Sequence, residues 1–296
     1  MTDLAQMRAQ MEGAAGFIAA LDQSGGSTPK ALGLYGVDAN DYGSEEEMFV
    51  EIQNMRERII LAPDFVREKV IGAILFERTL GEQIDGAPVS EYLWNSKGIV
   101  PFLKIDKGLE DQENGVQLMK PMPGLDDVLA KAASMGIFGT KERSVIHEAN
   151  AVGIKANVAQ QFDVAKQVCA AGLVPIVEPE VNINSATKSE AEAMMRDEIL
   201  GQLDALSGDQ AVMLKLTLPS EANFYDVLAD HPRVLRVVAL SGGYSTDEAC
   251  KLLAQNGKMI ASFSRALTEG LKKQMSDDEF SAAIGANINQ IYAASA

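Results

Sequence analysis

The sequence is poor in residues that metal and thiol chemistry need. Its 296 residues include two cysteines and two histidines. Cys169 and Cys250 show no metal-ligand spacing, so we expect both to be buried structural thiols in a reducing compartment. His147 and His231 lie far apart in the sequence and match no ligand motif. These absences disfavour a metal centre and a disulfide framework.

Positive charge and long apolar runs are also scarce. The chain has 26 Lys and Arg against 42 Asp and Glu, a formal net charge of −16. This balance disfavours a nucleic-acid or anionic-membrane partner, although a local cluster of basic side chains can still bind a small anion. No run approaches the ~18 apolar residues of a membrane-spanning helix. Residues 1–13 are typical of an amphipathic helix rather than a signal peptide, so we expect a cytoplasmic protein.

What is abundant is an alternation of short apolar runs with amphipathic segments. Eight runs predict strands over 16–22, 70–76, 99–106, 137–146, 173–181, 211–218, 233–240 and 258–264. Between and after them, helices are predicted over 45–60, 125–136, 157–172, 189–208, 246–257 and from 277 onward. Strands without polar alternation are typical of parallel sheets covered on both faces. Eight such units predict an α/β fold of the (β/α)8 TIM-barrel type, with a doubly wound open sheet as the alternative.

The chain offers no obvious point of division. Because no linker-like tract interrupts it, we expect a single barrel domain over 1–296, with a C-terminal helix over about 277–294. The long first crossover is interpreted as a βα unit with an inserted loop over 33–43. The one tryptophan, Trp94, falls in a loop expected over 91–98 and is interpreted as a rim or oligomer contact.

Charged residues stand where the apolar runs end. In a TIM barrel the chemistry lies at the carboxyl ends of the strands, and side chains two positions apart point the same way. Pairs at this spacing are Lys104 with Asp106, Lys141 with Arg143, and Glu178 with Glu180. Other strands carry or precede Asp22, Lys215, Ser241 and Arg265. A ring of charge at the barrel mouth is therefore expected.

Lys215 is the most unusual member of this ring. It lies within MLKLTL, on a strand that should be covered on both faces. An unpaired ammonium is costly to bury, and such a lysine responds by lowering its pKa and becoming nucleophilic. Lys141 would add a second cation, and Glu178 can neutralise one lysine and exchange protons with the other. This set predicts a nucleophilic site around a small substrate, with a structural salt-bridge network as the alternative.

The stretch SGGYSTDEA (241–249) predicts an anion site. Ser-Gly-Gly directly after a strand allows backbone N–H groups to approach an anion without clashes from Cβ atoms. Ser245 and Glu248 form a capping box that opens a helix, and helix N-termini favour negative charge. Barrel enzymes often bind phosphate with the loops after strands seven and eight, where Arg265 can close the site.

A second phosphate group would need a binding site elsewhere at the barrel mouth. The loop DQSGGSTPK (22–30) lacks Walker spacing, so Ser24, Ser27 and Lys30 either hold a distal phosphate or form a tight βα turn. Lys104 and Arg143 are alternative ligands for the distal phosphate. In contrast, we expect Asp106 and Lys107 to belong to a solvated rim.

In combination, these motifs are similar to those of class I fructose-1,6-bisphosphate aldolases of the shorter, bacterial-type subgroup. The resemblance spans about residues 16–270. The motifs on which it rests are AALDQSGGS, GAILFERTL, LKIDKG, the K-x-R of TKERSV, IVEPE, the Lys of MLKLTL, and LSGG followed by SR. The resemblance implies reversible cleavage of fructose 1,6-bisphosphate to dihydroxyacetone phosphate and glyceraldehyde 3-phosphate, a reaction of glycolysis and gluconeogenesis. It implies a sugar-phosphate partner, no cofactor and no metal, and leaves a homo-oligomer open.

The resemblance also assigns roles to individual residues. Lys215 would be the Schiff-base nucleophile and Glu178 the acid and base that dehydrates the carbinolamine. Glu180 and Lys141 would assist, and Asp22 would handle the proton on the hydroxyl beside the breaking bond. The ketose phosphate would be held by Ser241, Gly242, Gly243, Ser264 and Arg265, and the other end by candidates Ser24, Ser27, Lys30, Lys104 and Arg143.

The sequence departs from animal-type members at three places. Ser264 stands where they have a glycine, and Glu142 stands where they have a tryptophan. Their mobile tail ends in a tyrosine, whereas this chain ends QIYAASA and Tyr292 falls on a predicted terminal helix, so we leave it out of the site. Other hypotheses are another Schiff-base aldolase of phosphorylated sugars, a metal-dependent barrel lyase or isomerase, and a non-catalytic binding scaffold.

Overall fold

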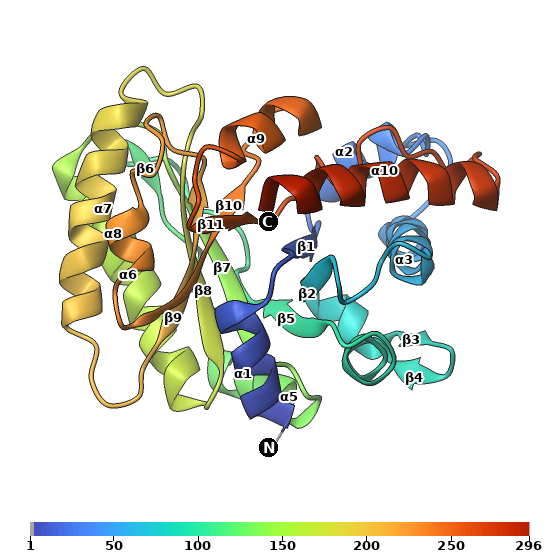
Figure 1. The fold of residues 1–296 in the computed structure, drawn as a ribbon, viewed down its shortest axis with the longest axis horizontal. Coiled ribbons are helices and arrows are strands. Elements are labelled where there is room, and N and C mark those ends of the chain that lie inside the picture. The colour runs from blue at the N-terminus through green and yellow to red at the C-terminus, as the bar shows by residue number, and fades with distance from the viewer. Residues whose placement is uncertain (1–2, 296) are drawn as a thin grey trace.

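Eight parallel strands form a nearly closed barrel (Figure 1). The computed structural model of the chain describes residues 3–295. In sheet order the strands are β1 (Phe17–Leu21), β2 (Val70–Leu75), β5 (Val100–Lys104), β7 (Gly139–Ile146), β8 (Val174–Val181), β9 (Val212–Thr217), β10 (Val234–Leu240) and β11 (Met259–Ala261). At the seam between the first and last strands, Ala20 N–H donates to the carbonyl of Phe263 at 3.2 Å. The predicted TIM barrel is confirmed, and the open-sheet alternative is not.

Helices and short extra elements surround the strands. The principal helices are α2 (Ser27–Leu34), α3 (Glu45–Leu61), α5 (Leu125–Ser134), α6 (Ala151–Ala170), α7 (Lys188–Asp204), α8 (Asp226–Ala229), α9 (Thr246–Leu253) and α10 (Asp277–Ser295). The additions are η1 (Glu77–Gly81), the hairpin β3 (Gln83–Ile84) and β4 (Ala87–Pro88), α4 (Val89–Glu91), the π-helix η2 (Tyr92–Ser96) and β6 (Val116–Gln117), which pairs antiparallel with β7. Each helix predicted from the sequence is present, but α6 begins six residues before its expected start at 157, and α7 and α9 each end four residues before their expected ends.

Apolar side chains fill the barrel from its amino end. Every residue of β1, β2 and β9 is buried, because one face points into the barrel and the other lies under the helices. The rings of Phe102 and Phe138 meet edge to face inside this core, with centroids 5.5 Å apart. This packed floor confines the charged side chains to the carboxyl ends of the strands.

The helix α1 (Asp3–Gly13) covers the amino end of the barrel. Its Met7 and Met11 join the core cluster inside the strands. Arg236, at the start of β10, donates to the carbonyl of Met11 at 2.9 Å and to that of Ala14 at 3.2 Å. A helix is therefore present where one was predicted for the first residues, and it closes the barrel end opposite the charged residues.

The C-terminal helix α10 lies against the seam of the barrel, with its carboxyl end beside β11 (Figure 1). The hydroxyl of Ser295 accepts the N–H of Ala261 at 3.0 Å, so the helix satisfies an edge donor of the last strand. Tyr292 is half-buried and packs on the core. The terminal helix predicted from residue 277 is confirmed, and it serves as the wall over the seam.

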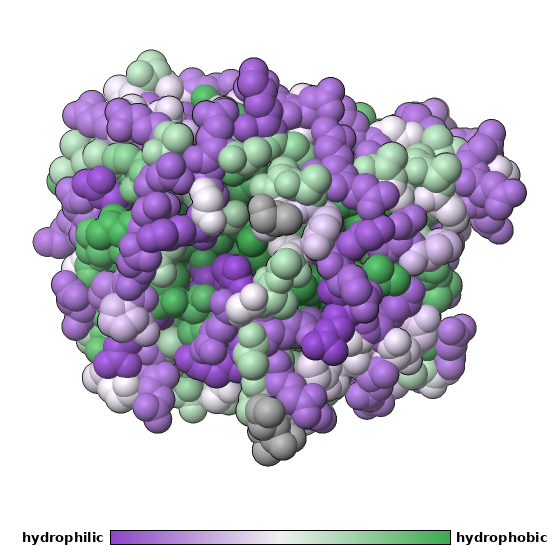
Figure 2. All heavy atoms as spheres, viewed as in Figure 1, coloured by the Kyte–Doolittle hydropathy of each residue, from purple (hydrophilic) through white to green (hydrophobic). Residues whose placement is uncertain are grey.

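Several local expectations differ from the structure. The segment 91–98, expected as a loop, contains the π-helix η2, whose wider turn the local sequence does not signal. Cys250 is buried as expected, but Cys169 is only half-buried. On the face shown in Figure 2, hydrophilic residues dominate the periphery and hydrophobic residues show through toward the middle. No helix among residues 3–295 combines the length and apolar character needed to cross a membrane.

Candidate active site

Two lysines and two carboxylates meet at the carboxyl ends of the strands. Lys141 on β7 lies 2.7 Å from Asp22, which follows β1, and 3.0 Å from Glu178 on β8, measured from Nζ to the carboxylate oxygens. The second oxygen of Glu178 lies 3.2 Å from Nζ of Lys215 on β9. None of the four residues is more than 9% exposed. Glu178 therefore bridges two buried ammonium groups.

Strand geometry brings these residues together. The strands β7, β8 and β9 are consecutive in the barrel, and Arg143 lies opposite Glu178 in the β7–β8 register. Side chains alternate faces along a strand, so Lys141, Glu178 and Lys215 all point into the mouth while the residues on either side of each point toward the helices. Buried charges need partners, and here each cation has a carboxylate within contact distance.

The charges hold one another in the ionised state. Burial alone would raise the pKa of Asp22, but the ammonium groups of Lys141, Lys215 and Lys104 outweigh it and hold that pKa well below its ordinary value. Burial likewise would raise the pKa of Glu178, and Lys141 and Lys215 again turn the net shift downward. For Lys141 burial acts to lower the pKa, whereas Asp22 and Glu178 raise it well above its usual range. Lys141 is therefore a fixed positive charge.

Asp106 belongs to this cluster, so its assignment to a solvated rim is wrong. It is 8% exposed, and one oxygen lies 3.4 Å from Nζ of Lys104. The other oxygen accepts the backbone N–H of Arg143 at 3.2 Å and lies 4.0 Å from Nζ of Lys141. Its spacing of two from Lys104 predicted that the two residues share a face, and the contact between them agrees with this. Lys107 itself forms an exposed ion pair, as expected.

Arg143 and Glu180 pair with each other nearer the solvent. Their side chains meet at 2.9 Å, with 42% of the Arg143 side chain exposed. Burial would lower the pKa of Arg143, but the carboxylates of Glu180 and Glu178 raise it above its ordinary value. Of the residues predicted for the site, these two lie on its rim, and each partly neutralises the charge of the other.

The loop after β10 lets other groups come close to its backbone. Gly242 and Gly243 have φ of +59° and +118°, a backbone conformation that glycine adopts without strain. A Cβ on Gly242 would lie 2.6 Å from the side chain of Ile183, and one on Gly243 would lie 3.3 Å from a guanidinium nitrogen of Arg265. The structure thus brings Arg265 directly over the Gly-Gly turn, as the motif predicts.

Two further contacts complete this side of the mouth. Ser245 caps α9 by accepting the N–H of Glu248 at 3.3 Å, which confirms the predicted helix start. Ser264, after β11, accepts from the side-chain amide of Gln23 at 2.9 Å and so links the two strands at the seam. Ser241, which directly follows β10, is buried.

The loop after β1 reaches Lys104. Nζ of Lys104 donates to the hydroxyl of Ser24 at 2.6 Å, and Ser27 donates to the carbonyl of Ser24 at 2.8 Å. Burial, and then the charge of Lys141, lower the pKa of Lys104. Lys30 is exposed on α2 and has no ion pair among residues 3–295. Ser24, Ser27 and Lys104 therefore form one group, from which Lys30 stands apart.

Arg56 was missed by the sequence analysis. This residue of α3 is 1% exposed, donates to the carbonyl of Gln23 and lies 3.0 Å from the hydroxyl of Thr79. Burial lowers its pKa to about 10, against the opposing effect of Asp22. It supports the loop that carries Asp22. Nothing in the segment 45–60 distinguishes this arginine from its solvated neighbours.

Comparison with known proteins agrees with the geometry. The model of the family described as fructose-bisphosphate aldolase class-I matches residues 3–222. A solved fructose-bisphosphate aldolase from Plasmodium falciparum, in complex with TRAP and a small-molecule inhibitor, superposes with a TM-score of 0.72 at 20% identity, covering 99% of this chain and 92% of that one. A protein of Corynebacterium glutamicum superposes with a TM-score of 0.55 at 12% identity, covering 99% and 93%. These two likenesses support the fold, and the family match spans most of the sequence. The chain belongs to the class I fructose-bisphosphate aldolase family, and its activity is the carbon–carbon lyase reaction of that family.

Proposed function

We propose that Lys215 is the Schiff-base nucleophile of this aldolase and that cleavage of fructose 1,6-bisphosphate needs no metal. The observation that carries the proposal is the bridging position of Glu178, 3.2 Å from Lys215 and 3.0 Å from Lys141. A lysine buried in this way has one proton acceptor within reach and a fixed cation behind that acceptor. Such an arrangement supports proton transfer at the nitrogen that must attack a ketone.

The first half of the reaction forms the iminium. Lys215 passes a proton to Glu178, and its free electron pair forms a C–N bond to the ketone carbon. A second proton moves from this nitrogen to the alkoxide oxygen and gives the neutral carbinolamine. Its hydroxyl leaves as water when Glu178 returns its proton to that oxygen, and the electron pair of the nitrogen forms the C=N bond of the iminium. Lys141 stays charged throughout, because Asp22 and Glu178 hold its pKa above the usual range. Its role is to stabilise whichever carboxylate is ionised at each step.

The second half breaks the carbon–carbon bond. The protonated iminium accepts the electron pair of the bond beta to it and becomes an enamine. Asp22, 2.7 Å from Lys141, takes the proton of the hydroxyl on the departing fragment, which leaves as glyceraldehyde 3-phosphate. Protonation of the enamine carbon and hydrolysis of the iminium then release dihydroxyacetone phosphate. Each positioned proton transfer contributes on the order of 10²–10⁴-fold in rate.

The two phosphates would be held on opposite sides of Lys215. Ser241, the Gly-Gly turn and Arg265 supply backbone donors and a guanidinium for the ketose phosphate. For the distal phosphate we favour Ser24 and Lys104, which already share a hydrogen bond. Ser27 adjoins them, whereas Arg143 is paired with Glu180 and Lys30 stands apart, so these two are second candidates. Sugar phosphates do not cross bilayers unaided, which supports a cytoplasmic location.

The test combines one variant with one chelator. Lys215→Met should abolish cleavage of fructose 1,6-bisphosphate while keeping the circular-dichroism spectrum, because the methionine preserves most of the apolar stem. Wild-type activity should be unchanged after exhaustive treatment with EDTA. Retained cleavage in Lys215→Met would remove the nucleophile from the proposal, and loss of activity with EDTA would favour a metal-dependent lyase.

A further inference from the structure

The sheet opens between β8 and β9 beside the residues proposed to react. Among the described residues 3–295, the register of these two strands covers two positions, and the second pairs Val177 with Leu214. Glu178 and Lys215 are the next residues on the two strands. In contrast, the pairing of β8 with β7 and that of β9 with β10 continue to the carboxyl ends of the strands. The opening is therefore local to the place where Glu178 meets Lys215.

Pro179 explains why the pairing stops at this point. The N–H groups of Val174 and Asn182 donate to carbonyls on the β7 side, at 3.1 and 2.8 Å. Successive N–H groups of a strand point to opposite neighbours, so the even-numbered residues of β8 donate toward β7 and position 179 faces β9. Proline has no N–H group, so the ladder toward β9 cannot continue through this residue. Another contact must hold the two strands together beyond it.

Thr217 makes this contact. Its hydroxyl donates to the carbonyl of Val181 at 2.7 Å, and the residue is fully buried. Thr217 comes two residues after Lys215 on β9, and Val181 comes three residues after Glu178 on β8. The 3.2 Å contact between Glu178 and Lys215 therefore lies between two fixed links. The last ladder pair is on its amino side, and the hydrogen bond of Thr217 is on its carboxyl side.

The chemistry of threonine suits this link. Its hydroxyl supplies a donor to a backbone carbonyl, as a ladder N–H would. Because the side chain is branched at Cβ, its χ1 angle is restricted and the hydroxyl has few alternative positions. A valine would have nearly the same shape but no donor, and it would leave the buried carbonyl of Val181 without this partner. The link therefore depends on one oxygen atom.

We infer that Thr217 is a positioning residue for the aldolase reaction, which holds β8 against β9 so that Glu178 stays in contact with Lys215. The inference rests on the proposed function, in which Lys215 attacks the ketone and Glu178 moves its protons. Protons are transferred between heavy atoms about 2.6–3.2 Å apart, so the observed 3.2 Å leaves little room for the strands to separate further. The proposed phosphate ligands lie on other loops, so the loss of Thr217 should affect the chemical step more than substrate binding.

The experiment compares Thr217→Val with Thr217→Ser in steady-state cleavage of fructose 1,6-bisphosphate. We expect Thr217→Val to lower kcat by roughly tenfold to hundredfold and to change KM by less than about threefold, because a displacement of about 1 Å in a reacting pair has an effect of this order. Thr217→Ser keeps the hydroxyl and should recover most of the lost rate. A threonine that only stabilised the fold would not produce this difference between kcat and KM.

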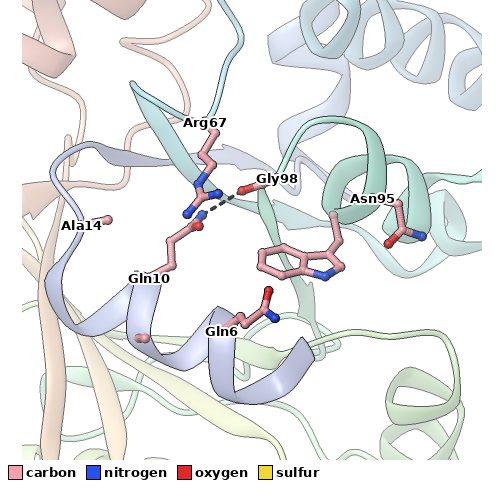
Figure 3. A pocket seen from close by; sticks show the side chains of 8 residues that line it. Gln6, Gln10, Ala14, Arg67, Asn95 and Gly98 are labelled. Atoms are coloured by element: carbon pink, nitrogen blue, oxygen red, sulfur yellow. Dashed lines mark hydrogen bonds between the residues drawn. The ribbon is translucent and has the colours of Figure 1, made fainter. Parts of the chain in front are cut away.

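Ser90→Ala is the matched control. Ser90 is 1% exposed and donates to the carbonyl of Met135 at 2.8 Å, so it also joins a buried hydroxyl to a backbone carbonyl, but before β7 rather than at the mouth. This variant should lower stability in urea and keep the kcat of wild type. Trp94, the sole tryptophan, reports unfolding in every variant, since it lines a pocket beside Gln10 at the amino end of the barrel (Figure 3).

Three results would overturn the inference. They are a wild-type kcat in Thr217→Val, an equal loss of kcat in Ser90→Ala, and a Thr217→Ser variant as slow as Thr217→Val. Should the valine variant not fold, Thr217→Ser and Thr217→Ala differ by the hydroxyl alone, and equal kcat in these two would overturn the inference instead.

Trapping with borohydride and dihydroxyacetone phosphate separates this inference from the proposed function. An adduct on a lysine other than Lys215 in wild type would remove both, because the contact with Glu178 would then not be the reacting one. An adduct on Lys215, together with a wild-type kcat in Thr217→Val, would remove the role of Thr217 and leave the proposed function in place.

Discussion

Oε1 of Glu178 lies 3.2 Å from Nζ of Lys215, with both side chains almost fully buried. Its other oxygen lies 3.0 Å from Lys141, whose charge is fixed by two carboxylates. The same carboxylate thus contacts the nitrogen proposed to react and a permanent cation. A proton can move between Glu178 and the substrate without leaving an isolated charge in the barrel, because Lys141 neutralises the carboxylate.

Glu178→Gln should reduce kcat for fructose 1,6-bisphosphate by about 10²–10⁴-fold, since the amide cannot accept the proton of Lys215. The amide keeps the volume of the side chain, so the barrel should stay folded. Steady-state kinetics of this variant are to be compared with those of Glu180→Gln. Glu180 pairs with Arg143 on the rim, and its variant should lose much less. Equal losses in the two variants would contradict the central role of Glu178.

The loss of folding stability at acid pH should depend on Asp22. Its folded pKa is lowered by Lys141, Lys215 and Lys104 against the effect of burial. Its contribution is therefore present above the unfolded pKa of about 3.9 and is lost as pH falls through the folded pKa. In urea unfolding between neutral pH and roughly pH 3, wild type should lose on the order of 1 kcal/mol more than Asp22→Asn. Parallel stability curves for the two proteins would refute this assignment.

Glu142 should have the opposite pH dependence. It is fully buried on the helix-facing side of β7, accepts from Thr140 at 3.2 Å, and its Oε1 has no partner among residues 3–295. Burial raises its pKa well above the ordinary value, so the folded state holds a proton that the unfolded state releases. Stability is then lost as pH rises from the unfolded pKa, about 4.3, toward the folded pKa.

Glu142→Gln should therefore stabilise the protein at neutral and alkaline pH, by about 1–3 kcal/mol, and change little in mild acid. Thermal unfolding at several pH values measures this. Glu190→Gln, at an exposed position of α7, serves as the control and should show no pH-dependent gain. A Glu142→Gln variant that is destabilised at every pH would show that the carboxyl group is favourable where it lies.

Arg265→Met should reduce kcat/KM for fructose 1,6-bisphosphate by about tenfold to hundredfold, through loss of a charged contact to phosphate. The guanidinium lies over the Gly-Gly turn after β10, where the phosphate is proposed to bind. Lys251→Met removes one exposed positive charge from the neighbouring helix α9 and should leave the kinetics unchanged. Similar losses in both variants would indicate a general electrostatic effect rather than a specific contact.

The sequence predicted the barrel because its strands are buried on both faces, which produces eight apolar runs that stop at charged residues. The same rule located Asp22, Lys141, Glu178 and Lys215, which the structure brings together. Asp106 was missed because its burial depends on charges from neighbouring strands.

Two other features could not be read from local sequence. Arg56 occupies a helix position that looks solvated, and only the tertiary structure reveals the carbonyl of Gln23 that it meets. The π-helix around Trp94 likewise depends on the packing of η2 beside α1 and β5. Long-range packing, which single-sequence patterns do not contain, decides both.

The most direct test of the account is to reduce the protein with borohydride in the presence of dihydroxyacetone phosphate and to map the adduct by mass spectrometry. A Schiff base formed during turnover becomes a stable secondary amine, so the peptide that gains mass identifies the nucleophile. We predict one adduct per chain, on Lys215, and none in Lys215→Met. An adduct on Lys141, on Lys104 or on any other lysine, or no adduct at all, would contradict the account.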